Sequence, residues 1–224
     1  MIYVLDLDGT LIDSGERHYR LMQEILSETA PEGMSERTLG MRFDPVEFMG
    51  YKADGYSGLQ YLTDCLGLEE KAAGQIMALW LQQIEEERWL KTDALYPDTL
   101  GFLERLKQAH SKIIYLTARQ NKEGLLQELK RLEIADYADD IQVVSPGDAG
   151  KAKKQVVKTL LAKTEEGEGT VCIVGDTENE YHLAKELSLP CFLLNRGARS
   201  EQYWKERGVK SIASLDKIEI DREM

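Results

Sequence analysis

Two carboxylates stand one residue apart near the start of the chain, at Asp6 and Asp8, directly after the apolar run Ile2–Leu5. Such a run predicts a strand that is buried on both faces, as the strands of parallel sheets are. Charge at the end of a buried strand is costly unless it has a partner. Carboxylate oxygens are ligands that Mg²⁺ prefers, and a carboxylate can also be a nucleophile that accepts a phosphoryl group. The alternative is an ordinary acidic turn, which Gly9 would permit.

Two other polar residues follow strand-like apolar runs further along the chain. Thr117 comes directly after Ile113–Leu116, and its hydroxyl could donate to a phosphate oxygen or simply cap a helix. Lys151 begins a segment with three lysines in the first turn of an expected helix, where the helix dipole favours anions. A bound anion would relieve that conflict; otherwise the lysines are solvated, a reading that suits Lys153 and Lys154 better than Lys151.

An acidic segment, Gly175–Glu180, follows a third apolar run, Val171–Val174. Asp176 could be a second carboxylate for a divalent cation. Glu180 has an equally good alternative as part of a helix-capping box with Thr177. Because ligands bind outside the carboxyl ends of the strands in open parallel sheets, we expect these polar residues to converge on one site.

The segment Asp6–Leu11 resembles the first motif of the haloacid dehalogenase superfamily, whose members are mostly Mg²⁺-dependent phosphohydrolases. Thr117, Lys151 and Gly175–Asp176 are similar to its second, third and fourth motifs, in the same order. The separation of 25 residues between Lys151 and Asp176 is typical of the family. The chain departs from the pattern at Glu180, where the family usually has an aspartate, so a direct contact of Glu180 with the metal is left open.

The resemblance implies a role for each matched residue. Asp6 would be the nucleophile that forms an aspartyl-phosphate, and Asp8 the general acid and base. The Asp8 carboxylate favours phosphoryl transfer, because the dehalogenases that name the superfamily lack it. The implied ligands of Mg²⁺ are Asp6, Asp8 through its backbone carbonyl, and Asp176, with Glu180 further out, and the implied phosphate-binding residues are Thr117, Ala118 and Lys151.

The function that the resemblance implies is a phosphatase for a small phosphorylated metabolite, most like the phosphoglycolate phosphatase branch. Two alternatives stay open: a phosphomutase of the β-phosphoglucomutase type, and a non-catalytic protein that binds a phosphorylated ligand.

Strands and helices that alternate predict a doubly wound α/β fold with a parallel sheet. The expected strands span residues 2–5, 112–117, 141–144, 171–174 and 191–194, and a short edge strand is expected at 211–212. The expected helices of this part are 99–109, 121–132, 151–163 and 179–187.

Residues 14–94 contain no strand candidate and predict an all-helical cap domain inserted into a core of residues 1–13 and 95–224. Helices are expected at 16–29, begun by a cap at Asp13, at 58–66 and at 69–91. A cap of this kind would supply specificity for the substrate. The candidates for substrate contact are Arg17, His18, Arg20, Arg42, Lys52 and, after the second motif, Arg119.

The composition narrows the class of protein. The 224 residues carry a net charge of −12, which argues against nucleic acid and anionic membranes as main partners. The three cysteines favour buried thiols in a reducing cytoplasm over a disulfide framework. The sequence is compatible with a monomer or a dimer.

Overall fold

The computed structural model describes residues 1–29, 43–163 and 170–220. The chain divides into two compact units, one made of Met1–Asp13 and Ala94–Met224, and the other of Ser14–Asp93. Each unit has its own hydrophobic core.

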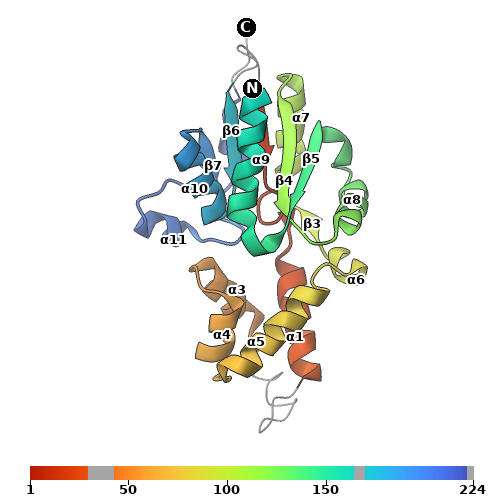
Figure 1. Ribbon diagram of the computed structural model, residues 1–224, viewed down its shortest axis with the longest axis vertical. Coiled ribbons are helices and arrows are strands. Elements are labelled where there is room, and N and C mark those ends of the chain that lie inside the picture. The colour runs from red at the N-terminus through yellow and green to blue at the C-terminus, as the bar shows by residue number, and fades with distance from the viewer. Residues whose placement is uncertain (30–42, 164–169, 221–224) are drawn as a thin grey trace. The chain divides into compact units, whose positions relative to one another are not determined.

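The first unit is built on a five-stranded parallel sheet in the order β5-β4-β1-β6-β7 (Figure 1). Its strands are β1 (Ile2–Leu5), β4 (Lys112–Ala118), β5 (Asp140–Val144), β6 (Val171–Gly175) and β7 (Cys191–Leu193). The central strand β1 is buried along its whole length, as its apolar sequence predicts.

Helices cover both faces of this sheet, which confirms the predicted doubly wound α/β fold. Alternate residues of β1 enter different cores: Tyr3 and Leu5 belong to one, and Ile2 and Val4 to the other. The helices α7 (Thr99–Gln108) and α8 (Lys122–Arg131) contribute apolar side chains to the hydrophobic core that contains Tyr3. The helices α9 (Ala149–Lys163) and α10 (Glu178–Leu187) contribute apolar side chains to the other hydrophobic core, which contains Val4.

A short antiparallel pair that the sequence analysis does not predict stands where the chain leaves and re-enters this unit. It consists of β2 (Ile12–Asp13) and β3 (Ala94–Leu95), with Asp13 opposite Ala94. Because Asp13 belongs to β2, the N-cap residue of the next helix is Ser14, and the expectation of a cap at Asp13 is wrong. The predicted edge strand at 211–212 is a single bridge between Leu194 and Ile212. Helix α11 (Glu201–Glu206) and short 3₁₀ turns complete the unit.

The described part of the second unit is helical throughout. Its helices are α1 (Gly15–Glu28), α3 (Pro45–Ala53), α4 (Gly58–Asp64), α5 (Glu70–Gln83) and α6 (Glu87–Leu90). The helix expected over 69–91 is therefore two helices, separated between Gln83 and Glu87. A single cluster of apolar side chains, including Leu21, Phe48 and Tyr61, fills this unit. That the unit acts as a cap stays a prediction. Among the described residues, no helix is long and apolar enough to cross a membrane.

Candidate active site

Three of the predicted site residues lie at the same edge of the sheet, because β1, β4 and β6 are neighbouring parallel strands. Asp6 directly follows β1, and its backbone N–H donates to the Val174 carbonyl at 2.9 Å. Thr117 is the last residue but one of β4, and Asp176 directly follows β6. All three side chains are buried. The carboxyl ends of the strands thus bring distant parts of the chain together, as open parallel sheets do.

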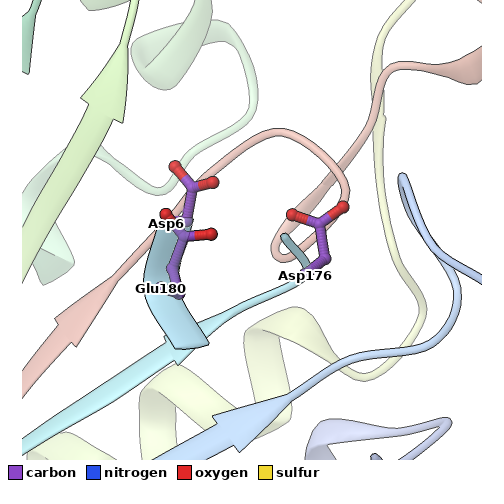
Figure 2. Close-up of side chains that lie close together, drawn as sticks. All are labelled: Asp6, Asp176 and Glu180. Atoms are coloured by element: carbon purple, nitrogen blue, oxygen red, sulfur yellow. The ribbon is translucent and has the colours of Figure 1, made fainter. Parts of the chain in front are cut away.

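Three buried carboxylates form a cluster at this edge. One ligand oxygen from each of Asp6, Asp176 and Glu180 lies within 4.8 Å of those of the other two (Figure 2). Glu180 comes from the first turn of α10, the helix that follows β6. Such a set of hard oxygen donors is suited to Mg²⁺.

The lysine of the cluster is Lys153 of α9. Its Nζ lies 2.9 Å from Oδ1 of Asp6 and 2.7 Å from Oε1 of Glu180, and its side chain is only 5% exposed. Lys153 therefore holds a positive charge between two of the three carboxylates.

The structure corrects the prediction for Lys151. Its side chain is 81% exposed, and its Nζ lies 3.9 Å from Oδ2 of Asp148, away from the cluster. Both lysines belong to α9, where each residue is rotated by about 100° from the last, so residues two apart occupy different faces of the helix. The lysine that faces the sheet is Lys153, which the sequence analysis assigned to solvent.

The ionisation of the cluster follows from its burial and its one ammonium group. Burial raises the pKa of Asp6 to about 6, although Lys153 opposes the rise. Burial and the charge of Asp6 raise the pKa of Asp176 well above its usual value. Burial alone would also raise the pKa of Glu180, but the ion pair with Lys153 outweighs it and holds that pKa below the usual value. The two carboxylates keep Lys153 charged, since they raise its pKa despite burial.

These charges fit a divalent cation. When all three carboxylates are ionised, the single ammonium of Lys153 leaves two negative charges in a buried space. Buried charge without compensation is strongly unfavourable. A cation held by Asp6 and Asp176 would supply the missing positive charge, and its oxygen ligands are the correct type for Mg²⁺.

Glu180 forms the capping box that its sequence indicates, and it also holds Lys153, a contact that the sequence analysis did not predict. Its Oε2 accepts from the Thr177 backbone N–H at 3.2 Å and from the Thr177 hydroxyl at 2.5 Å, which completes the capping box of α10. Its other oxygen, Oε1, binds Lys153. With its two oxygens engaged in this way, Glu180 is better placed to orient Lys153 than to be a primary metal ligand.

A loop after β7 also contributes to the site, and the sequence analysis missed it. The Ala198 backbone N–H donates to Oδ2 of Asp176 at 2.6 Å. A side chain at Gly197 would place its Cβ 2.2 Å from that same oxygen and 2.4 Å from the Cα of Gly9. Both glycines are thus required for two backbone segments to close around Asp176. The signal in the sequence is Arg196–Gly197, which follows a strand-like run as the other site loops do.

Asp8 lies beside Arg119 at the rim of the site. Nη2 of Arg119 donates to Oδ1 of Asp8 at 2.8 Å, and Nε lies 2.8 Å from Oδ2. Nη2 also donates to Glu128 of α8 at 3.1 Å. Arg119, predicted as a substrate contact, is thus buried between two carboxylates, while Ala118, predicted to bind phosphate, ends β4 opposite Val144.

The candidates from the helical unit differ in their surroundings. Arg17 is buried, and its Nε lies 3.2 Å from Oδ2 of Asp93, so the prediction that it contacts substrate is corrected: this guanidinium serves an internal ion pair. Arg20 is 53% exposed and pairs with Glu16. Arg42 lies outside the described residues.

His18 forms a small cluster with two other residues of the helical unit. Its Nδ1 lies 2.7 Å from Nζ of Lys52, and its ring is 5.1 Å from that of Trp80. Lys52 also lies over the Trp80 ring. A role of His18 or Lys52 in substrate binding stays a prediction.

Comparisons with known proteins agree with this geometry. The family model described as haloacid dehalogenase-like hydrolase matches residues 1–187. No curated protein matches the chain in sequence.

Similar solved structures share the fold over nearly the whole chain. A provisionally named phosphatase from Clostridium difficile is 18% identical, with a TM-score of 0.70, over 94% of this chain and 92% of that one. A provisionally named phosphoglycolate phosphatase from Lactobacillus delbrueckii subsp. bulgaricus is 15% identical, with a TM-score of 0.68, over 96% and 95%. CbbY from Rhodobacter sphaeroides, solved in complex with phosphate, is 16% identical, with a TM-score of 0.62, over 97% and 96%. At these identities the similarity shows the fold.

Proposed function

The chain belongs to the haloacid dehalogenase-like hydrolases, and from this premise we propose that it is a phosphatase that hydrolyses a small phosphorylated metabolite through an aspartyl-phosphate. The observation that carries the proposal is Asp6, a buried carboxylate at the end of the central strand, with Lys153 at 2.9 Å and Asp176 in the same cluster. The names of the solved relatives, a phosphatase and a phosphoglycolate phosphatase, support the reaction class.

In the first step, an Asp6 carboxylate oxygen attacks phosphorus and the ester P–O bond breaks. Asp8 gives its proton to the leaving oxygen, which departs as an alcohol. In the second step, water attacks phosphorus and gives its proton to the Asp8 carboxylate, while the bond between Asp6 and phosphorus breaks. Inorganic phosphate leaves, and both aspartates return to their starting states.

Lys153 and Thr117 would stabilise the negative charge on the phosphoryl oxygens, and the backbone N–H of Ala118 would be a further donor. Charge stabilisation by positioned donors and cations is the main source of rate in phosphoryl transfer. Asp6 and Asp176 would hold Mg²⁺ together with the Asp8 backbone carbonyl, and Glu180 would act from further out. When bound, Mg²⁺ would draw the phosphoryl group toward Asp6 and neutralise its charge.

The surroundings of the reaction follow from the same proposal. The three cysteines are free thiols, which suits a reducing compartment, so we place the enzyme in the cytoplasm. The substrate would be small and phosphorylated, and the net charge of −12 gives no general attraction for nucleic acid.

The proposal is tested by phosphate release from p-nitrophenyl phosphate and from a panel of phosphorylated metabolites, with Mg²⁺ and with a chelator. Asp6→Asn removes the nucleophile, so we expect turnover to fall by at least about 10³-fold, in line with the loss of a covalent catalyst. The matched control is Asp140→Asn, an exposed aspartate at the start of β5, which should keep wild-type turnover. Equal turnover by wild type and Asp6→Asn, or turnover that is indifferent to the chelator, would contradict the proposal.

A further inference from the structure

Arg119 connects two acidic residues that lie far apart in the sequence. Its guanidinium contacts Asp8 at the rim of the site and Glu128 on α8. The side chain of Arg119 is 3% exposed and that of Glu128 is 1% exposed, whereas that of Asp8 is 27% exposed. The contact thus runs from the interior of the core to a carboxylate that reaches solvent.

The inner end of this chain of contacts is fixed. Glu128 lies on the buried face of α8 between Leu125 and Leu129, and an unpaired carboxylate there would be strongly unfavourable. Arg119 cannot turn toward solvent without leaving Glu128 behind. The backbone of Arg119 is also held, because its N–H donates to the Val144 carbonyl at 3.0 Å.

The outer end gives Asp8 a defined orientation. The guanidinium approaches both oxygens of the carboxylate at 2.8 Å, through a hydrogen bond from Nη2 to Oδ1 and an ion-pair contact of Nε with Oδ2, and the single ammonium of a lysine cannot reproduce both contacts while it also serves Glu128. A half-exposed aspartate without such a partner samples several rotamers. Displacement of a reacting group by about 1 Å can cost about 10²-fold in rate.

We propose that Arg119, anchored by Glu128, is a positioning residue that orients the Asp8 carboxylate for proton transfer, and that it does not bind the substrate. This inference rests on the proposed function, in which Asp8 is the proton donor and acceptor. The burial of Arg119 favours this role over the substrate contact that the sequence suggested.

A double-mutant cycle tests the inference, with p-nitrophenyl phosphate and saturating Mg²⁺. If Arg119 acts only through Asp8, then Arg119→Lys should lower kcat about 10- to 100-fold with KM within about twofold, because a group that acts only in the transition state changes kcat alone. In the Asp8→Asn background the same substitution should change kcat by less than about twofold, since residues that act as a unit are not additive.

Glu128→Gln provides a second cycle in a variant that keeps the volume of the side chain. We expect a smaller fall in kcat than for Arg119→Lys, and again less than about twofold in the Asp8→Asn background. Should Arg119→Lys fail to fold, this cycle decides the question alone. Arg105→Lys is the matched control, because Arg105 pairs with the exposed Asp216 on the surface of the same unit, and it should keep wild-type kinetics.

Two outcomes would overturn the inference in an active enzyme. One is that Arg119→Lys lowers kcat by the same factor in the wild-type and Asp8→Asn backgrounds. The other is that Arg119→Lys raises KM and leaves kcat unchanged, which would indicate substrate binding. A wild-type protein that releases no phosphate from any ester would instead overturn the proposed function, and the inference with it. The two failures are therefore distinguished by the wild-type measurement.

Discussion

Lys153 determines how three buried carboxylates can coexist at the end of the sheet. Its ammonium group lies within 3 Å of oxygens from Asp6 and Glu180, and both carboxylates keep it charged. Glu180 is in turn held by Thr177, so the orientation of Lys153 is set by the first turn of α10. A substrate phosphoryl group at Asp6 would meet this positive charge directly, which makes Lys153 a sharper test of the site than any exposed cation.

Substitution of Lys153 and of Lys151, each in turn, tests whether the phosphate-binding lysine is the one that the structure places at Asp6 or the one that the sequence predicted. Lys153→Met should lower kcat/KM by about 10²- to 10³-fold, the usual effect of removing one group that stabilises transition-state charge. Lys151→Met should stay within about twofold of wild type, because that side chain is 81% exposed. Phosphate release from p-nitrophenyl phosphate with Mg²⁺ measures both.

Lys153→Met also leaves two buried carboxylates without their cation, which can cost about 3–5 kcal/mol of stability. Thermal unfolding of each variant is therefore required, and Lys153→Arg is the variant that keeps the charge. Loss of activity in Lys151→Met, with Lys153→Met folded and active, would show that the phosphate-binding lysine is the exposed one.

At the scale of the element, Asp176 is fixed by the approach of two loops. The loop after β1 contributes Gly9, with φ of +74°, and the loop after β7 contributes Gly197 and the N–H of Ala198. The loop after β1 also contributes the Thr10 hydroxyl, which donates to Oδ1 of Asp176 at 3.5 Å, so movement of either loop would break a hydrogen bond to Asp176. The proposed metal site thus depends on the loop that follows β7, a strand that itself contributes none of the proposed ligands.

Gly197→Ala should disturb Asp176 without a change to any ligand. The new Cβ would lie 2.2 Å from Oδ2 of Asp176 and 2.6 Å from the Gly9 carbonyl oxygen, so backbone must shift. We expect the affinity for Mg²⁺ to fall about 10- to 100-fold, as when a partner of a metal ligand is lost. Calorimetric titration of the protein with Mg²⁺ measures this without reference to turnover.

Gly101→Ala is the matched control for that substitution. Gly101 lies within α7, where a Cβ would meet nothing within 4 Å, so alanine there should raise stability by about 0.5–1 kcal/mol and leave Mg²⁺ binding unchanged. A Gly197→Ala protein that binds Mg²⁺ as tightly as wild type would show that the loop after β7 does not position Asp176.

The strands and helices also show which features could be predicted from the sequence and which could not. Apolar runs such as Val171–Val174 are long enough to identify the strands, and the sheet then places Asp6 and Asp176 at one edge by topology alone. The choice between Lys151 and Lys153 depends on which face of α9 meets the sheet, and residues two apart differ there by more than half a turn. The apolar period of α9 carries that signal, since Lys153 lies four residues before the buried Val157 and seven before Leu160, but the motif at Lys151 was assigned without it.

Very short strands and contacts between residues far apart in the chain could not be predicted from the sequence either. The strands β2 and β3 have two residues each, too few for any hydrophobic period. The contact between Arg119 and Asp8 joins residues 111 positions apart, and the burial of Arg17 depends on Asp93 at the other end of the helical unit. Each of these requires the fold before it can be recognised.

At the scale of the whole molecule, the two units are joined at one place in the core. Asp13 and Ala94 are paired neighbours in the β2–β3 ladder. The chain therefore leaves the core and returns to it at two adjacent residues. Among the residues that the structure describes, each apolar cluster is made from one unit: one from the helical unit, and the others from the core. The helical unit can therefore be removed at a point where the core already forms a hairpin-like pair.

Replacement of residues 14–93 by the two-residue turn Asn-Gly should leave a core that folds, because such turns close antiparallel pairs of this kind. We expect cooperative thermal unfolding and turnover of p-nitrophenyl phosphate within about tenfold of wild type, since the proposed catalytic residues all belong to the core. If the helical unit acts as the cap, the shortened enzyme should lose its discrimination among phosphorylated metabolites. Asp6→Asn in the shortened chain is the control that the remaining turnover uses the same site. Unchanged selectivity in an active core would contradict the cap role, and a core that does not unfold cooperatively would show that its stability depends on the helical unit.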